Sequence, residues 1–175
     1  SRDPKLLSIM NAPSDSEAGD LHGQNVRAIF GIPYEEQSLP HNKSYRTRAK
    51  NYIFGAIYGS KGFEIQEVIE KEMLKSGDIN LPIPSLREIM RSIDVLHNTY
   101  STYFLEWVPA ALDACRNSGG YAYTIFGRPR YVPEVFSKDK AERGHAERAV
   151  ISHIIQGSAG DILRRAKHGV NAYIQ

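Results

Sequence analysis

Four side chains with functional chemistry recur at every fourth position in one stretch of this chain. They are Arg46, Lys50, Phe54 and Tyr58, and Gly59 follows the last of them. On an α-helix a spacing of four produces one slowly drifting stripe. At 1.5 Å per residue this stripe would run for roughly 18 Å. Its order, with cations first and aromatic rings after them, suits a nucleoside triphosphate laid along the helix with its phosphates at the basic end.

Length and composition indicate an ordinary globular chain. The 175 residues correspond to about one domain, and 41% hydrophobic and 24% charged residues are enough to build a core. A net charge of +2 does not by itself predict a polyanionic partner. The stretch between Glu36 and Glu64, however, has no acidic residue, and a local basic patch of this kind can attract phosphates. Its cations are Lys43, Arg46, Arg48, Lys50 and Lys61. Without the aromatic stripe, a solvated helix face would be the default interpretation.

Cysteine usage and hydropathy bear on the compartment. Cys115 is the single cysteine, so an intrachain disulfide is excluded and a reducing compartment fits. The sequence has no apolar run near the ~20 residues that span a membrane, and its first residues do not resemble a signal peptide. Because no initiating Met is present, a longer parent protein is consistent with the sequence.

The periodicity predicts a mainly α fold with one small β-hairpin. Turn signals and apolar spacing predict strands at about 121–126 and 130–132, joined by a turn at Gly127-Arg128-Pro129. Ser85 is the expected N-cap of a long helix with core spacing up to Trp107. Pro109 should kink this helix or start a new segment. The other expected helices cover about 21–30, about 43–57, a segment from Gly62, about 139–155 and about 158–173.

Four segments in order make the sequence resemble the family A (DNA polymerase I-like) DNA polymerases. They are Gly19-Asp20-Leu21-His22 with Ile29 to Pro33, the 46–59 stripe, the hairpin Gly120 to Pro133, and Ala146 to Ala149 with Gln156 to Asp161. The stripe is similar to the nucleotide-binding helix of that family. The resemblance implies that residues 1–175 form a single helical fingers region with part of the palm junction, including a nucleotide-binding helix at about 43–57, a hairpin at about 121–132 and closing helices at about 139–173.

The resemblance also implies roles in binding the incoming dNTP. Arg46 and Lys50 would hold the triphosphate, and Lys50 would act as the general acid that protonates the leaving pyrophosphate. Phe54 would lie under the sugar, and His22 would reach the β-phosphate from the preceding helix. The alternatives are two exposed cations on an amphipathic helix, a core Phe, and a structural His.

Five residues are expected to contact the primer-template on the same grounds. Tyr58 would stack at the template position, and Gly59 would let the backbone approach the nascent base pair. Arg128, Arg148 and Gln156 would contact the duplex, with Arg on phosphates and Gln on minor-groove acceptors. For each of these last three, a surface or capping role is the alternative. Near Gln156 the sequence departs from the family, because Ser152 stands where Asn is usual.

Catalytic metal ligands are not expected within the chain. The resemblance places the two metal-binding aspartates before Ser1 and after Gln175, so Mg²⁺ would belong to the parent enzyme. Phosphoryl transfer of this type needs a two-metal clamp, and we therefore expect the isolated chain not to polymerise DNA. The implied partners are dNTP, primer-template DNA and the remaining palm and thumb, with no membrane. The implied location is the cytoplasm of a bacterium or a phage-infected host, with an organelle as the alternative.

Two other functions stay open at this point. A single-subunit RNA polymerase is similar at Arg46, Lys50 and the local sequence Tyr58 to Lys61, whereas Phe54 and the hairpin favour DNA synthesis. A non-enzymatic helical module could instead bind nucleic acid through the basic patch. Such a module would not respond to dNTP.

Overall fold

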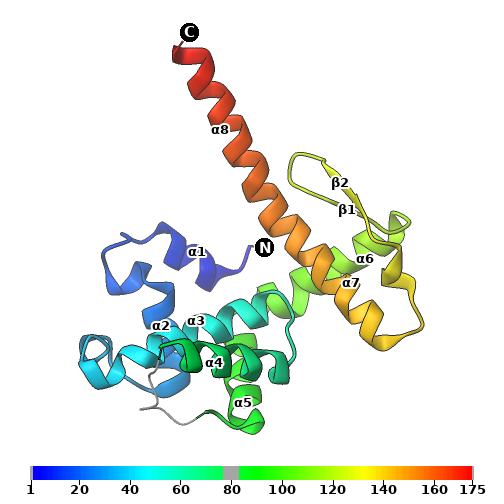
Figure 1. Cartoon of the computed structure of the whole chain (residues 1–175). Coiled ribbons are helices and arrows are strands. Elements are labelled where there is room, and N and C mark those ends of the chain that lie inside the picture. Colours follow the sequence, from blue (N-terminus) through cyan, green and yellow to red (C-terminus); the bar gives the residue numbers. More distant parts are fainter. Residues whose placement is uncertain (1, 77–82, 175) are drawn as a thin grey trace. The chain divides into compact units, whose positions relative to one another are not determined.

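The structure is a computed structural model that describes residues 2–76 and 83–174. It is mainly α-helical and contains a two-stranded antiparallel hairpin (Figure 1). The expected fold class is therefore confirmed. The chain divides into two compact units, Ser1–Trp107 and Val108–Gln175, and each is described by itself.

The first unit is built around α3, which packs against α2, α4 and α5 (Figure 1). Its α-helices are α1 (Pro4–Asn11), α2 (Leu21–Phe30), α3 (Lys43–Ile57), α4 (Gly62–Ser76) and α5 (Leu86–Thr99). Short 3-10 turns cover Glu17–Gly19, Tyr34–Glu36 and Pro40–Asn42, and a π-helical segment covers Thr102–Trp107.

The bounds of α3 agree with the helix that the spacing predicted. Ala49, Tyr52 and Ile53 are at most 1% exposed, so one face of the helix is sealed in the core. The helix ends where the Gly59 N–H donates to the Ala56 carbonyl. Gly59 has a φ of +72°, in the left-handed region that favours glycine, which explains why the chain can turn sharply here.

The long helix expected to run from residue 86 to Trp107 is interrupted. α5 starts at a capping box formed by Ser85 and Glu88, as its sequence indicated, but it ends at Thr99. A π-helical segment follows, in which the Tyr103 ring stacks on Trp107 at 5.2 Å between ring centroids. The Tyr103 hydroxyl donates to the Ile57 carbonyl at the end of α3. The spacing of apolar residues does not predict such a π-helical segment, because tertiary contacts stabilise it.

Helix α1 was not anticipated from the sequence. Asp3 caps it by accepting from the N–H groups of Lys5 and Leu6, both at 3.0 Å, and Pro4 is its first residue. The same carboxylate accepts from the buried N–H of Tyr103 at 3.1 Å. Asp before Pro is a recognised start signal, so this helix could have been predicted.

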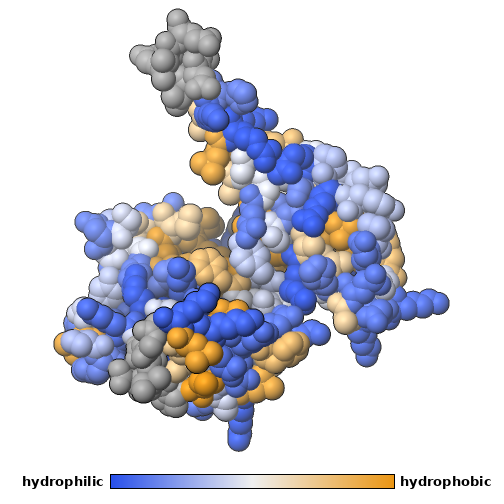
Figure 2. Space-filling view, in the orientation of Figure 1, coloured by the Kyte–Doolittle hydropathy of each residue, from blue (hydrophilic) through white to orange (hydrophobic). Residues whose placement is uncertain are grey.

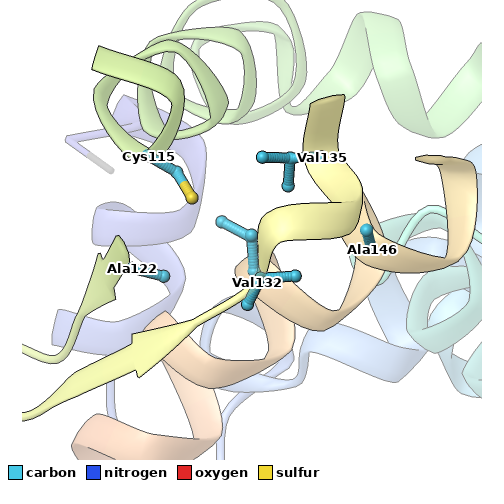
Figure 3. Close-up of a cluster of buried hydrophobic side chains, with 6 residues drawn as sticks. Cys115, Ala122, Val132, Val135 and Ala146 are labelled. Carbon is cyan, nitrogen blue, oxygen red and sulfur yellow. The ribbon is translucent and has the colours of Figure 1, made fainter. Parts of the chain in front are cut away.

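The second unit packs its hairpin against α6 and the region between α7 and α8. Its elements are α6 (Val108–Asn117), β1 (Tyr121–Tyr123), β2 (Pro129–Tyr131), a 3-10 turn (Pro133–Phe136), α7 (Lys140–Ser152), a π-helical segment (His153–Gly157) and α8 (Ser158–Ile174). The two strands pair Tyr121 with Tyr131 and Ala122 with Arg130. β1 is shorter than the strand expected at about 121–126, whereas β2 has the expected length and lies one residue earlier than the strand expected at about 130–132. A cluster of buried side chains holds these elements together (Figure 3). Its members are Cys115, Ala122, Val132, Val135, Ala146 and Val150.

Hydrophilic residues cover most of the face in Figure 2, and apolar residues gather there in small groups. Among the helical residues that the structure describes, none forms a stretch long and apolar enough to cross a membrane.

Replacing Asp3 by Ala should destabilise the first unit more than replacing Ser85 by Ala, although both residues cap a helix. Ser85→Ala removes an exposed cap, which typically costs about 1 kcal/mol. Asp3→Ala also leaves the Tyr103 N–H buried without its acceptor, so we expect a loss of about 2 kcal/mol or more. Denaturant unfolding of the two variants measures the difference, and equal losses would show that the Tyr103 contact contributes little.

Candidate functional site

The stripe of α3 lies outside the buried face of that helix. Arg46, Lys50 and Phe54 are exposed, Phe54 by 43%, and Tyr58 is half-buried at the end of the helix. The buried face consists of Arg48, Ala49, Tyr52, Ile53 and Ala56. Two cations and one ring, in the order Arg46, Lys50 and Phe54, are therefore accessible along α3, and Tyr58 follows at the end of the helix.

One member of the predicted basic patch does not belong to this surface. Arg48 is 9% exposed, and its Nη2 lies 3.9 Å from the sulfur of Met73 in α4. Arg48 follows Arg46 by two positions, which on a helix turns it by about 200°. Arg46 and Arg48 of the predicted patch thus lie on different faces of α3.

Asp20 is the closest charged partner of the stripe. Its carboxylate accepts from both terminal nitrogens of Arg46, at 2.6 Å and 2.9 Å, across 26 positions of sequence. Asp20 also caps α2 by accepting from the Gly23 N–H, and the Tyr34 hydroxyl donates to it. Neither Asp20 nor Tyr34 was predicted from the sequence to belong to the site. The helix-start pattern could have indicated the cap, whereas the ion pair depends on tertiary structure.

These contacts keep Asp20 ionised. Burial on its own disfavours the charged carboxylate, but hydrogen bonds from Arg46 and Gly23 and the charge of Arg46 outweigh burial and lower the pKa of Asp20. The same pair raises the pKa of Arg46, mainly through the hydrogen bonds to Asp20. Arg46 is thus a fixed cation in this arrangement, rather than a freely moving surface side chain.

His22 lies beside the stripe, in the first turn of α2. Its ring centroid is 5.9 Å from that of Phe54, and the Lys50 Nζ is 5.8 Å from the same Phe54 centroid. Desolvation and then the positive charge of Arg46 lower the pKa of His22 below its usual 6.5, with a smaller effect from Lys50. The Nδ1 atom of His22 is buried and makes no hydrogen bond within the described residues. The structure therefore brings His22 together with Arg46, Lys50 and Phe54, and the lowered pKa favours the neutral imidazole.

The residues expected to contact the duplex lie in the second unit, and Arg128 is already engaged there. Its Nε donates to Asp161 at 2.8 Å, and its Nη2 donates to the Gly157 carbonyl at 3.1 Å. A Cβ at Gly157 would lie 3.0 Å from that Nη2, so the guanidinium is packed closely against the π-helical segment. Arg128 thus anchors the hairpin turn to the start of α8 and to the π-helical segment before it.

Arg148 and Gln156 occupy the same unit. Arg148 is half-buried on α7, whereas Gln156 is exposed in the π-helical segment. The Ser152 hydroxyl donates to the Gln156 Oε1 at 3.2 Å. This bond occupies the carbonyl end of the amide and leaves the NH₂ end as a donor.

The described residues do not fit a Mg²⁺ site. Within them, no group of three or more His, Cys, Asp and Glu side chains could hold a metal ion. The carboxylate nearest the stripe, Asp20, is used by Arg46. The chemistry that these residues can supply is therefore cationic binding, ring stacking and proton donation.

Comparison with known proteins shows the family to which the chain belongs. The sequence matches DNA polymerase family A over residues 1–175. The chain belongs to this family. The match favours DNA polymerases over the single-subunit RNA polymerases that the stripe also resembles. The family A chain is 31% identical over 156 residues to DNA polymerase I of Pseudomonas aeruginosa, covering 89% of the chain and 15% of that protein. It is 34% identical over 149 residues to DNA polymerase I of Borreliella burgdorferi, covering 84% and 14%.

A solved structure supports the same assignment. The family A chain is similar to the POL domain of Pol1 from M. smegmatis in complex with DNA primer-template and dNTP. The TM-score is 0.76 at 26% identity, and the match covers 99% of this chain and 26% of that one. The chain thus spans about 15% of the length of the curated relatives it matches.

The His22 pKa offers a test of the geometry. We expect His22 to titrate below 6.5 in the folded chain, and Arg46→Ala to raise its pKa. Both consequences of that change act in the same direction, since a cation is removed and the Asp20 charge is no longer neutralised. The neutral ring then contributes stability above pH 6.5 that is lost as the pH falls toward the folded pKa. NMR titration of the ring protons measures the shift. Arg27→Ala is the control, because Arg27 lies on α2 with His22 but pairs with Glu17. An equal shift of the His22 pKa in this variant would contradict the placement of Arg46 beside His22.

Proposed function

We propose that this chain forms the dNTP-binding fingers region of a template-directed DNA polymerase and contacts the nascent base pair. The observation that carries the proposal is the accessible side of α3, where Arg46, Lys50 and Phe54 meet His22 of α2. Membership of DNA polymerase family A supports it. So does the likeness to a polymerase domain that was solved with primer-template and dNTP.

The geometry suggests how a dNTP would lie. The triphosphate would contact Arg46 and Lys50, with the neutral His22 imidazole donating a hydrogen bond to the β-phosphate. The sugar would pack on the exposed Phe54 ring, close to the Lys50 ammonium. Fixed cations stabilise charge that develops on a leaving pyrophosphate, and Lys50 would also donate the proton that it needs. Tyr58 and the backbone at Gly59 would then meet the base pair at the end of α3.

In the second unit, Gln156 is the best-placed candidate for contact with the duplex. Its exposed amide keeps its NH₂ group as a donor because Ser152 binds the oxygen. Minor-groove acceptors are common to all base pairs, so such a donor would contact DNA without reading its sequence. Arg148 would bind phosphate. Arg128 would contact DNA only through the N–H groups that Asp161 and Gly157 do not use.

The remaining parts of the proposal concern the parent enzyme. It would be a DNA-directed DNA polymerase, with its metal-binding aspartates in segments outside these 175 residues and with Mg²⁺ bound there. The isolated chain would therefore bind ligands without extending a primer. The palm and thumb would complete the nucleotide pocket around α3, and the cytoplasm of a bacterium or phage-infected cell remains the proposed location.

Titration of the purified chain with dNTP and, separately, with primer-template duplex tests the proposal. We expect weak dNTP binding that shifts the NMR signals of α3 and of the α2 start, and that Arg46→Ala or Lys50→Ala reduces severalfold. Arg87→Ala removes an exposed cation from α5 and serves as the matched control. A chain that binds DNA but shows no response to dNTP would support the non-enzymatic module instead.

Lys50→Ala in a polymerase that contains this chain should slow nucleotide incorporation far more than it weakens DNA binding. Loss of a general acid typically reduces the rate about 100-fold or more. Single-turnover incorporation measures the rate, and equilibrium binding to labelled primer-template measures affinity. Unchanged incorporation, or a parallel loss of DNA affinity, would exclude a catalytic role for Lys50.

A further inference from the structure

The carboxylate of Asp20 is held in a fixed position. Its Oδ1 accepts from the Gly23 N–H at 3.0 Å, and its Oδ2 accepts from the Tyr34 hydroxyl at 3.3 Å. A Cβ at Gly23 would lie 2.6 Å from the Tyr34 ring and 2.8 Å from the Asp20 carboxylate, so no side chain fits between them. The Asp20 side chain is only 14% exposed. These contacts make it a rigid reference point at the start of α2.

Arg46 reaches this point through the end of its guanidinium. Nη1 and Nη2 each donate one N–H to the carboxylate, at 2.6 Å and 2.9 Å. A guanidinium has five N–H bonds in a planar fork. Pairing through both terminal nitrogens leaves a second two-donor face, made by Nε–H and the adjacent terminal N–H. A phosphate oxygen pair can be bound by such a face.

We propose that Asp20 is a positioning residue that orients Arg46 so that its remaining two-donor face is presented to the triphosphate of the incoming nucleotide. This inference rests on the proposed function, because it concerns the phosphate end of the same site. It adds Asp20 to the residues that act in nucleotide binding, and it makes the ion pair part of the binding surface.

The physical gain is preorganisation. An exposed Arg has many rotamers, and ordering such a side chain on binding costs affinity by about two- to tenfold. Here the ordering is already achieved in the free chain, by a carboxylate that is itself fixed. Asp20 and His22 belong to the same turn of α2. The start of this helix therefore places both Arg46, through Asp20, and His22, which are the two proposed phosphate ligands at this end of the site. Since Asp20 is neutralised by Arg46, Lys50 remains as the net positive charge of the site.

The opposite hypothesis is that Asp20 competes with the triphosphate for Arg46. The two hypotheses predict opposite signs for a change that removes the carboxylate but keeps the helix cap. Asp20→Ser is such a change, because Ser is a good N-cap and is too short to reach Arg46 as the carboxylate does.

The experiment is a double-mutant cycle on the whole chain. Wild type, Asp20→Ser, Arg46→Ala and the double variant are titrated with inorganic tripolyphosphate and with dNTP by calorimetry. We expect Asp20→Ser to weaken both ligands about two- to tenfold, and to have no further effect once Arg46 is Ala. Asp139→Ser is the control, because the Asp139 carboxylate also caps an α-helix, α7 in the other unit, where it accepts from the N–H groups of Ala141 and Glu142. The affinity of this variant should equal that of wild type.

A second measurement does not depend on any ligand. In ¹⁵N NMR spectra, a guanidinium held by a bidentate carboxylate shows separate Nη signals because its rotation is slow. We expect separate Arg46 signals in wild type and a merged signal in Asp20→Ser. A merged signal in wild type would overturn the inference without reference to binding.

The outcomes separate the two proposals. If Arg46→Ala weakens binding while Asp20→Ser leaves it unchanged or tightens it, the positioning role is wrong and the proposed function stands. If Arg46→Ala has no effect on tripolyphosphate or dNTP, both fail. Should Asp20→Ser not fold, Asp20→Asn keeps the cap and the side-chain shape while removing the charge. It should give a merged Nη signal and weaker binding, and wild-type affinity in that variant would overturn the inference.

Discussion

Burial of one face of α3 is the constraint on which the rest of the site depends. Ala49, Tyr52 and Ile53 are sealed against α2, α4 and α5, and a helix of fixed period then has no freedom in which side chains it exposes. Arg46, Lys50 and Phe54 are accessible because these three apolar residues are not. The chemistry of the site is therefore set by packing on the far side of the helix, and any change that rotated α3 would move every ligand at once.

The start of α2 supplies the second half of the arrangement. A helix beginning needs an acceptor for its first N–H groups, and Asp20 meets that need with the same carboxylate that binds Arg46. His22 lies two positions after Asp20, and its ring is thereby placed beside Phe54. A single local solution to helix capping thus fixes two helices relative to each other within the first unit and gathers the polar groups at one end of the stripe.

Spacing and end signals were enough to predict α3, α2 and the hairpin, because those features are local. The same reasoning could have removed Arg48 from the basic patch, since a side chain two positions after Arg46 on a helix points to the opposite face. It could not have found the pairing of Asp20 with Arg46, which joins residues 26 positions apart. Nor could it have found the π-helical segments, where the backbone follows contacts such as that of Tyr103 with Ile57. The features that could not be predicted from the sequence are tertiary contacts. They include Asp20, the partner of the predicted site residue Arg46.

The hairpin of the second unit shows why a charged residue in a family motif need not act through its charge alone. Arg128 binds Asp161 and the Gly157 carbonyl, and His153 contacts the Arg128 carbonyl through Nε2 at 3.2 Å. These contacts tie the hairpin turn to the π-helical segment that carries Gln156. Loss of Arg128 would therefore disturb the element that presents Gln156, whether or not its guanidinium reaches DNA. An effect of Arg128 on duplex binding would fit either role, so only a comparison with Asp161, which shares the anchor and has no attraction for phosphate, separates them.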